Sequence, residues 1–236
     1  MTPIQSSGFY SKKGFIVLSI TFILIVGFSI QLIIPHDGSV FIMQFLVLVL
    51  VYLTTRVRRT GLSEIGFTSP VNIKQTILYS LLYTVLIFFI FRIGLEPILE
   101  NITGEERDLS RFDFLKHNFG AVGQTLVMIW ISAAFFEEVF FRGYLIKYIS
   151  LLFNKTQLGW VIGIIISSIF FAFVHQYQGI SGILLTGLAA VFLGYVYYRH
   201  QDNLWIPIIA HGLTDTSAVL LYYFDVYEEV TRIIFS

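Results

Sequence analysis

The sequence predicts an all-α fold, a polytopic transmembrane helical bundle with about seven spans, in the range of roughly six to eight. Two observations support this. Of the 236 residues, 56% are hydrophobic and only 13% are charged, and the mean hydropathy is +0.79; a soluble domain carries about 25% charged residues. Apolar runs of bilayer length also recur along the chain. Since no internal repeat or change in composition divides it, we expect residues 1–236 to form a single integral-membrane domain.

The first three expected spans are uncharged runs bounded by polar residues. Phe15–Ile34 follows Lys12 and Lys13. It is longer than the about 7–15 apolar residues of a signal peptide, and no Ala-x-Ala site follows it, so we expect a retained anchor. Val40–Leu53 is shorter and ends before three arginines, and Gln75–Phe91 ends before a polar and strongly charged stretch.

Four further spans are expected after the polar segment 94–118. Phe119–Phe136 leads directly into a charged stretch that is considered below. The other three are apolar runs separated by short polar turns: Leu158–Val174, Gly179–Tyr198 and Leu204–Phe224.

Lysine and arginine residues in the short loops indicate orientation, because such residues are enriched on the cytoplasmic side. Basic residues precede the first span and follow the second, fourth and sixth spans. This places all of them on one side of the membrane. We therefore expect a cytoplasmic N-terminus, an external C-terminus and a location in the plasma (cell) membrane. The residues used are Lys12, Lys13, Arg56, Arg58, Arg59, Lys74, Lys147, Lys155 and Arg199.

Charge and cysteine content exclude several function classes. The formal net charge is zero, so no bulk electrostatic attraction favours a nucleic-acid partner. Cysteine is absent, which excludes disulfides, thiolate metal sites, a cysteine nucleophile and a lipidated cysteine anchor. The lipid bilayer is the first partner that the composition implies.

The stretch FFEEVFFRGY, residues 135–144, places three charged residues among phenylalanines. On a helix Glu138 and Arg142 are four residues apart and can pair, whereas Glu137 is rotated away from Glu138 by about 100° and has no obvious local partner. A lone charge at a helix end would simply reach water at the membrane edge. Three charges together are harder to explain in this way, since each costs about 2.5–3.5 kcal/mol near the bilayer centre.

Two later spans carry further ionisable residues. His175 ends the fifth apolar run, four residues after Phe171, and His211 and Asp215 are four apart on one face of the last span. A single histidine in a span is more often a packed, hydrogen-bonded group than a ligand. The joint occurrence of these residues with Glu137 on three spans instead indicates a site.

A carboxylate opposite two imidazoles can activate water. Burial disfavours the charged form of a glutamate and makes it a better general base. Alternatively, two histidines and a carboxylate could hold Zn²⁺, which lowers the pKa of bound water to about 7. The residues leave both options open, either no cofactor or a divalent metal such as Zn²⁺. The candidate ligands are Glu137, His175, His211 and Asp215.

These motifs resemble those of a known family. EEVFFRG is similar to the Glu-Glu-x-x-x-Arg motif of the CAAX-prenyl-protease and bacteriocin-processing (CPBP, or Abi) intramembrane proteases. Phe171 and His175 match its Phe-x-x-x-His motif, and His211 and Asp215 match its His-x-x-x-Asn/Asp motif. The three motifs occur in the family's order, and the resemblance implies a catalytic core at 119–224.

The resemblance implies an intramembrane endopeptidase that hydrolyses peptide bonds of membrane-associated peptides or proteins, including lipidated C-termini or secreted peptides. Glu137 would activate water, and Glu138, paired with Arg142, would shape the site or assist. His175 would hold the water or a metal. His211 and Asp215 would stabilise the oxyanion or complete a metal site. Because an ionised aspartate only accepts hydrogen bonds, Asp215 fits better with orienting His211 or binding a metal.

Three alternatives belong to other classes. Ser181 in a Gly-x-Ser-Gly pattern, with His211, resembles the dyad of rhomboid serine proteases, but this leaves Glu137, Glu138 and His175 unexplained. A membrane immunity factor or regulatory scaffold would need none of the motif residues, yet all are present. A proton-coupled transporter would typically show paired repeats with broken helices, and the sequence shows none.

Overall fold

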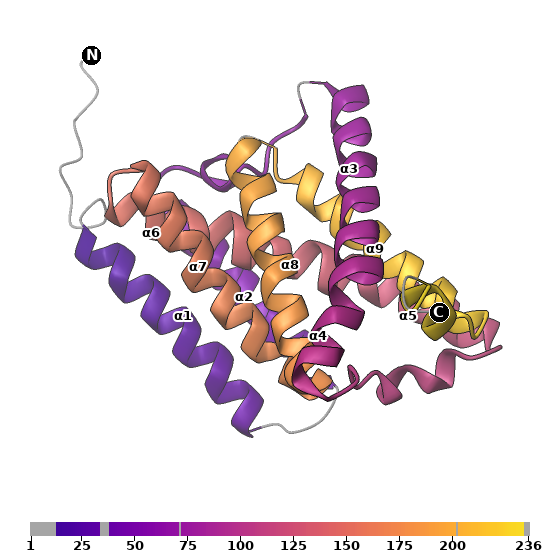
Figure 1. Cartoon of the computed structure of the whole chain (residues 1–236). Coiled ribbons are helices and arrows are strands. Elements are labelled where there is room, and N and C mark those ends of the chain that lie inside the picture. The colour runs from indigo at the N-terminus through magenta and orange to yellow at the C-terminus, as the bar shows by residue number, and fades with distance from the viewer. Residues whose placement is uncertain (1–12, 34–37, 71, 202, 234–236) are drawn as a thin grey trace, which may run out of the picture.

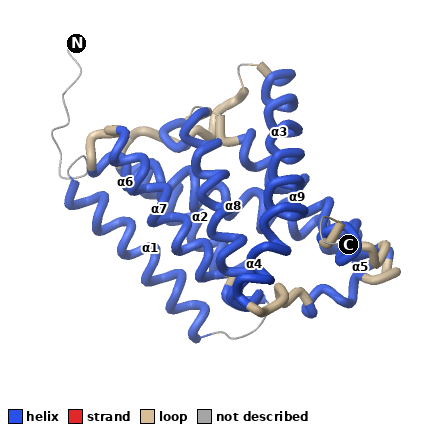
Figure 2. The backbone as a smooth tube through the Cα atoms, in the orientation of Figure 1, coloured by secondary structure: helices blue, strands red, loops and turns tan. Residues whose placement is uncertain are grey.

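The computed structural model describes residues 13–33, 38–70, 72–201 and 203–233, and all regular structure in these ranges is helical (Figures 1 and 2). The absence of strands from the described residues confirms the all-α prediction. Lys12, which was used to predict the orientation, and Ile34, the predicted end of the first span, lie outside these ranges. The helices, with η for 3₁₀ or π geometry, are α1 (Lys13–Ile33), α2 (Gly38–Val57), η2 (Leu62–Ile65), α3 (Ile73–Ile87), η3 (Phe88–Leu95), α4 (Glu96–Thr103), η4 (Ser110–Leu115), α5 (Phe119–Met128), η5 (Ile129–Ile146), α6 (Lys147–Leu152), α7 (Gln157–Val174), η6 (Gln176–Gln178), α8 (Gly179–Arg199), α9 (Trp205–Tyr223) and α10 (Tyr227–Thr231).

Four helical stretches within the described ranges are long and apolar enough to cross a membrane. Lys13–Gly27 and Ile42–Val57 form shorter apolar helices. The α9 helix, predicted as a span, is not among the four, because hydroxyl and ionisable side chains lower its hydropathy. The total of seven spans stays a prediction. The four stretches are Ile73–Thr103, Phe119–Leu152, Gln157–Val174 and Gln176–Arg199.

The helices of the third and fourth predicted spans extend further than their apolar runs predict. The run that ends at Phe91 continues as helix through η3 and α4, because Arg92 and Glu96 lie on one face, with Nη1 and Oε2 3.9 Å apart, and are both buried. The run that ends at Phe136 continues through η5 and α6 to Leu152. Charged residues therefore interrupt the hydropathy signal without interrupting the helix.

Both neighbouring and sequence-distant helices pack side by side. Figure 1 shows α7 and α8 as an antiparallel pair, with α3 alongside α9. Gly163 of α7 allows a close crossing with η5, because a Cβ atom there would lie 2.8 Å from the carbonyl oxygen of Ile146. Ser80 of α3 donates to the carbonyl of Ile206 on α9, at 3.3 Å. These contacts bring η5, α7 and α9 into one bundle.

The loop between α2 and α3 is fastened to α6 by Glu64. Its carboxylate accepts hydrogen bonds from Arg58 at 3.0 Å, from Thr60 at 2.7 Å and from the Tyr148 hydroxyl at 3.0 Å. Burial alone raises the pKa of Glu64, but the hydrogen bonds from these three groups outweigh it and hold the pKa below its usual value of 4.5. The loops after α2, α6 and α8 lie at one end of the molecule (Figure 1), as the grouping of basic residues requires.

Candidate active site

The candidate site is built from three elements that the sequence motifs occupy. Glu137, Glu138 and Arg142 lie on η5, His175 directly follows α7, and α9 carries the third motif. The backbone of η5 has π geometry, in which each N–H bonds to the carbonyl five residues before rather than four. Such segments are rare and occur frequently at functional sites. Ser167 of α7 donates to the carbonyl of Phe141, at 2.9 Å, and holds α7 against η5.

Glu138 lies at the centre of the site and is completely buried. Its Oε1 atom is 2.7 Å from Nδ1 of His211 and 2.9 Å from Nη1 of Arg142. The Arg142 side chain is only 1% exposed. The pairing of Glu138 with Arg142, expected from their spacing, is thus present, and one carboxylate oxygen also joins η5 to α9.

His211 lies between two carboxylates. Nδ1 faces Glu138, and Nε2 is 3.4 Å from Oδ2 of Asp215, one turn further along α9. Ionised carboxylates accept hydrogen bonds and donate none. Both ring nitrogens therefore carry protons, and the ring holds a positive charge. The contact with Asp215 is the one expected of a residue that orients His211.

Phe171 lies among the charged groups, and its contacts explain why an aromatic residue occupies this position. Its ring centroid is 4.4 Å from the guanidinium carbon of Arg142 and 4.5 Å from the ring of His175, with His211 at 6.2 Å. A buried cation over an aromatic face is stabilised by the ring quadrupole. Phe171 thus supports the arginine that pairs with Glu138.

His175 is held in one tautomer by the backbone of α7. Its Nδ1 atom lies 2.8 Å from the carbonyl oxygen of Phe171. Because a carbonyl can only accept, Nδ1 carries the proton of the neutral ring. Nε2 then has a free lone pair, and it makes no hydrogen bond with any residue that the structure describes.

Glu137 differs from its neighbour because it has no hydrogen-bond partner among the described residues. Its Oε2 atom is nevertheless shielded from solvent. Glu137 is within electrostatic range of His211, Asp215 and Arg142. The structure therefore brings the predicted residues of all three motifs into one cluster, in which Glu138 contacts Arg142 and His211 through Oε1, whereas Glu137 makes no hydrogen bond with any described residue.

The predicted metal ligands do not form a ready coordination sphere. No group of three or more His, Cys, Asp or Glu side chains within the described part of the chain is arranged to hold a metal ion. Both nitrogens of His211 already face carboxylates. We therefore derive no catalytic step through a metal.

The alternative serine dyad is not assembled in this structure. Ser181 is 2% exposed, and its Oγ atom has no hydrogen-bond partner among the described residues. The ring nitrogens of His211 face Glu138 and Asp215 instead. A nucleophilic serine would need its base within hydrogen-bond reach.

A second buried charge cluster adjoins the site and was missed in the sequence. Glu96 accepts a hydrogen bond from the Tyr227 hydroxyl at 2.8 Å and lies 3.7 Å from Nη1 of Arg107. Arg107 also donates to Gln178 at 2.8 Å, just after His175. Burial alone lowers the pKa of Arg107, but the Tyr227 and Glu96 oxygens raise it above its usual value. The four-residue spacing of Arg92 and Glu96 was the only sequence signal for this cluster.

Comparison with known proteins identifies the segment that carries the motifs. The model of a family described as type II CAAX prenyl endopeptidase Rce1-like matches residues 121–217. Neither a search of curated proteins nor one of solved structures found a match. The matched family is a protease family, which supports a peptidase, and the apolar helices support an integral membrane protein. Residues 121–217 thus match the Rce1-like type II CAAX prenyl endopeptidase family, which is consistent with the CPBP proteases that the motifs resemble.

Proposed function

We propose that this protein is an intramembrane endopeptidase that hydrolyses peptide bonds of membrane-associated peptides or proteins, with Glu137 as the base that activates water. The observation that carries the proposal is the contrast between the two adjacent glutamates. Glu138 is committed to Arg142 and His211, whereas Glu137 has no hydrogen bond although it lies within the same charged cluster. A general base needs a carboxylate that is positioned but not already engaged.

The remaining residues have complementary roles in this proposal. A water donates one hydrogen to Nε2 of His175 and the other to Glu137. As Glu137 takes its proton, the water oxygen bonds to the carbonyl carbon of the substrate, and the carbonyl oxygen becomes an oxyanion. The positive charge of His211, maintained by Glu138 and Asp215, stabilises this oxyanion.

Breakdown of the tetrahedral intermediate completes the hydrolysis. Glu137 transfers its proton to the nitrogen of the leaving amine as the carbon–nitrogen bond breaks. The products are a carboxylic acid and an amine, and Glu137 returns to its ionised form. Arg142 and Phe171 keep Glu138 in place, so they act as positioning residues.

Substrate class and location are parts of the same proposal. A site among apolar helices suits a peptide that reaches it from the membrane, such as a lipidated C-terminus or a secreted peptide. We propose residues 119–224 as the catalytic core, and the plasma membrane with a cytoplasmic N-terminus as the location.

The test compares membrane peptides in cells that carry the wild type or Glu137→Gln. Peptides that accumulate only in the variant are synthesised and offered to both purified proteins. Loss of a general base reduces the rate by about 10²–10⁴-fold, so we expect at least a 100-fold loss of cleavage with unchanged folded yield. The result also names the substrates.

Ser181→Ala is the matched control, because it removes a buried hydroxyl that makes no hydrogen bond in the described structure. We expect it to cleave at the wild-type rate. Cleavage that survives Glu137→Gln, or that is lost in a folded Ser181→Ala variant, would overturn the assignment of the base. Identical peptide profiles in wild type and Glu137→Gln would favour a non-catalytic membrane regulator.

A further inference from the structure

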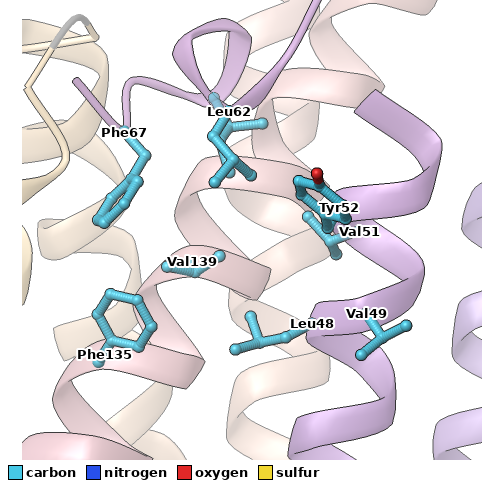
Figure 3. A pocket seen from close by; sticks show the side chains of 9 residues that line it. Leu48, Val49, Val51, Tyr52, Leu62, Phe67, Phe135 and Val139 are labelled. Carbon is cyan, nitrogen blue, oxygen red and sulfur yellow. The ribbon is translucent and has the colours of Figure 1, made fainter. Parts of the chain in front are cut away.

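An apolar groove lies between α2, the η2 segment and η5. Figure 3 shows its side chains converging from these three elements. The cavity measures about 220 Å³, and the hydroxyl of Tyr52 is the only polar side-chain group in its lining. Leu62 and Phe67 cover one end of the groove, and Phe135 and Val139 form the side that belongs to η5.

The groove opens toward the outside of the bundle. Val49 and Tyr52, which line it, are 36% and 46% exposed, whereas Val51, Ile65 and Val139 on its inner side are buried. Apolar cavities do not retain water, because a bound water needs two to four polar partners. In a membrane protein, an apolar groove open to the outside fits a hydrocarbon chain.

Two cations without a carboxylate partner lie beyond one end of the groove. Arg56 is one turn past Tyr52 on α2, with its guanidinium carbon 5.9 Å from the Tyr52 ring centroid, and Arg59 follows in the next turn. Both side chains are exposed, and no ion pair involves either of them in the described residues. Glu64, the acid of the adjoining η2 segment, is already paired with Arg58.

Aromatic side chains at the same end suit a membrane–water interface. Trp205 packs against Phe67, with ring centroids 5.1 Å apart, and donates to the backbone carbonyl of Thr68. Tryptophan and tyrosine are enriched at the level of the lipid headgroups. The groove therefore runs from headgroup level into the apolar zone, with positive charge at its polar end.

We propose that this groove binds one anionic phospholipid, with an acyl chain against Val139 and Phe135 and its phosphate at Arg56 and Arg59. The unpaired positive charge selects an anionic rather than a zwitterionic headgroup, since basic residues near the surface attract anionic lipids by about fivefold in affinity per residue. The acyl chain packs against η5, the helix that carries Glu137 and Glu138. This inference does not depend on the proposed peptidase activity.

The test measures lipid binding to the full-length purified protein in a neutral detergent. Dioleoyl phosphatidylglycerol and dioleoyl phosphatidylcholine, which have the same chains, are titrated separately and the bound lipid is counted by native mass spectrometry. We expect one saturable site with at least a tenfold preference for phosphatidylglycerol. Equal affinity for the two lipids, or no saturable site, would overturn the proposal.

Variants separate the headgroup contact from the chain contact. In the Arg56→Gln/Arg59→Gln protein we expect the preference to fall below twofold. Val49→Trp fills the groove mouth and should weaken both lipids at least tenfold. The matched control is Lys155→Gln/Arg199→Gln, which removes two exposed charges at the same end of the molecule but outside the groove, and it should bind as the wild type does.

Several outcomes would contradict the proposal. A preference for phosphatidylglycerol that persists without Arg56 and Arg59, or that falls equally in the control, would show that net charge rather than this site selects the lipid. If Val49→Trp does not fold, Val49→Met provides the smaller obstruction. Displacement of the phospholipid by a lipidated peptide at equimolar concentration would show that the groove is a substrate site instead.

Discussion

Removal of Arg142 tests the network on which the candidate site depends. Arg142 and Glu138 are 1% and 0% exposed, and their ion pair is 2.9 Å long. Breaking a buried pair by deleting one partner costs about 3–5 kcal/mol, because a buried charge is left without its partner. Loss of the contact with Phe171 adds about 0.5–2 kcal/mol. His211 still donates to Glu138 and offsets part of this. We therefore expect Arg142→Met to lower the free energy of unfolding by about 3–5 kcal/mol.

The assay is equilibrium unfolding in mixed micelles. The proportion of denaturing detergent is increased stepwise, and the fraction of folded protein is measured at each step. Lys155→Gln, which removes an exposed charge, is the control and should lie within about 0.5 kcal/mol of the wild type. Adding Glu138→Gln to Arg142→Met should recover part of the loss, because the unpaired charge is then also removed. A loss below about 1 kcal/mol for Arg142→Met, or no recovery in the double variant, would refute the reasoning.

Three other predictions concern different parts of the fold. Because the pKa of Glu64 lies below its usual 4.5, its carboxylate stabilises the protein above pH 4.5, and this contribution is lost as the pH falls further. The difference in unfolding free energy between wild type and Glu64→Gln should therefore shrink below pH 4.5. A difference that grows there would contradict the paired carboxylate. Gly163→Ala should lower the free energy of unfolding by about 1–3 kcal/mol, because the new Cβ atom would lie 2.8 Å from η5. Gly123→Ala, whose Cβ atom would meet no atom within 4 Å, is the control and should be neutral or stabilising by up to about 1 kcal/mol. Equal thermal stabilities of the two variants would show that the helix crossing relaxes. Tyr227→Phe removes a buried hydrogen bond of 2.8 Å to a carboxylate and should cost about 1.5–3 kcal/mol in the same unfolding assay, and an unchanged midpoint would show that water replaces the hydroxyl.

The sequence predicts contacts within one helix better than contacts between helices. The Glu138–Arg142 pair follows from four-residue spacing alone, and the helical class follows from composition and apolar runs. Which of the two adjacent glutamates reaches His211 depends instead on the rotation of η5. The π geometry that sets this rotation is a property of backbone hydrogen bonding, and hydropathy patterns do not encode it.

Other features could not be predicted because they join distant segments. The cluster around Glu96 takes residues from α4, the following loop, η6 and α10, and no spacing rule connects them. Helix ends were misjudged for a related reason. Arg92 looks like a boundary in a hydropathy profile, but its burial beside Glu96 lets the helix continue to Thr103.

The bridge from Glu138 to His211 also constrains the order of biogenesis. The two residues are 73 positions apart, so the ribosome completes the helix with Glu138 well before it synthesises His211. Until then, Arg142 alone neutralises that carboxylate in the nascent chain. A truncated product that ends before α9 therefore carries a membrane-embedded carboxylate that lacks one of its two cationic partners.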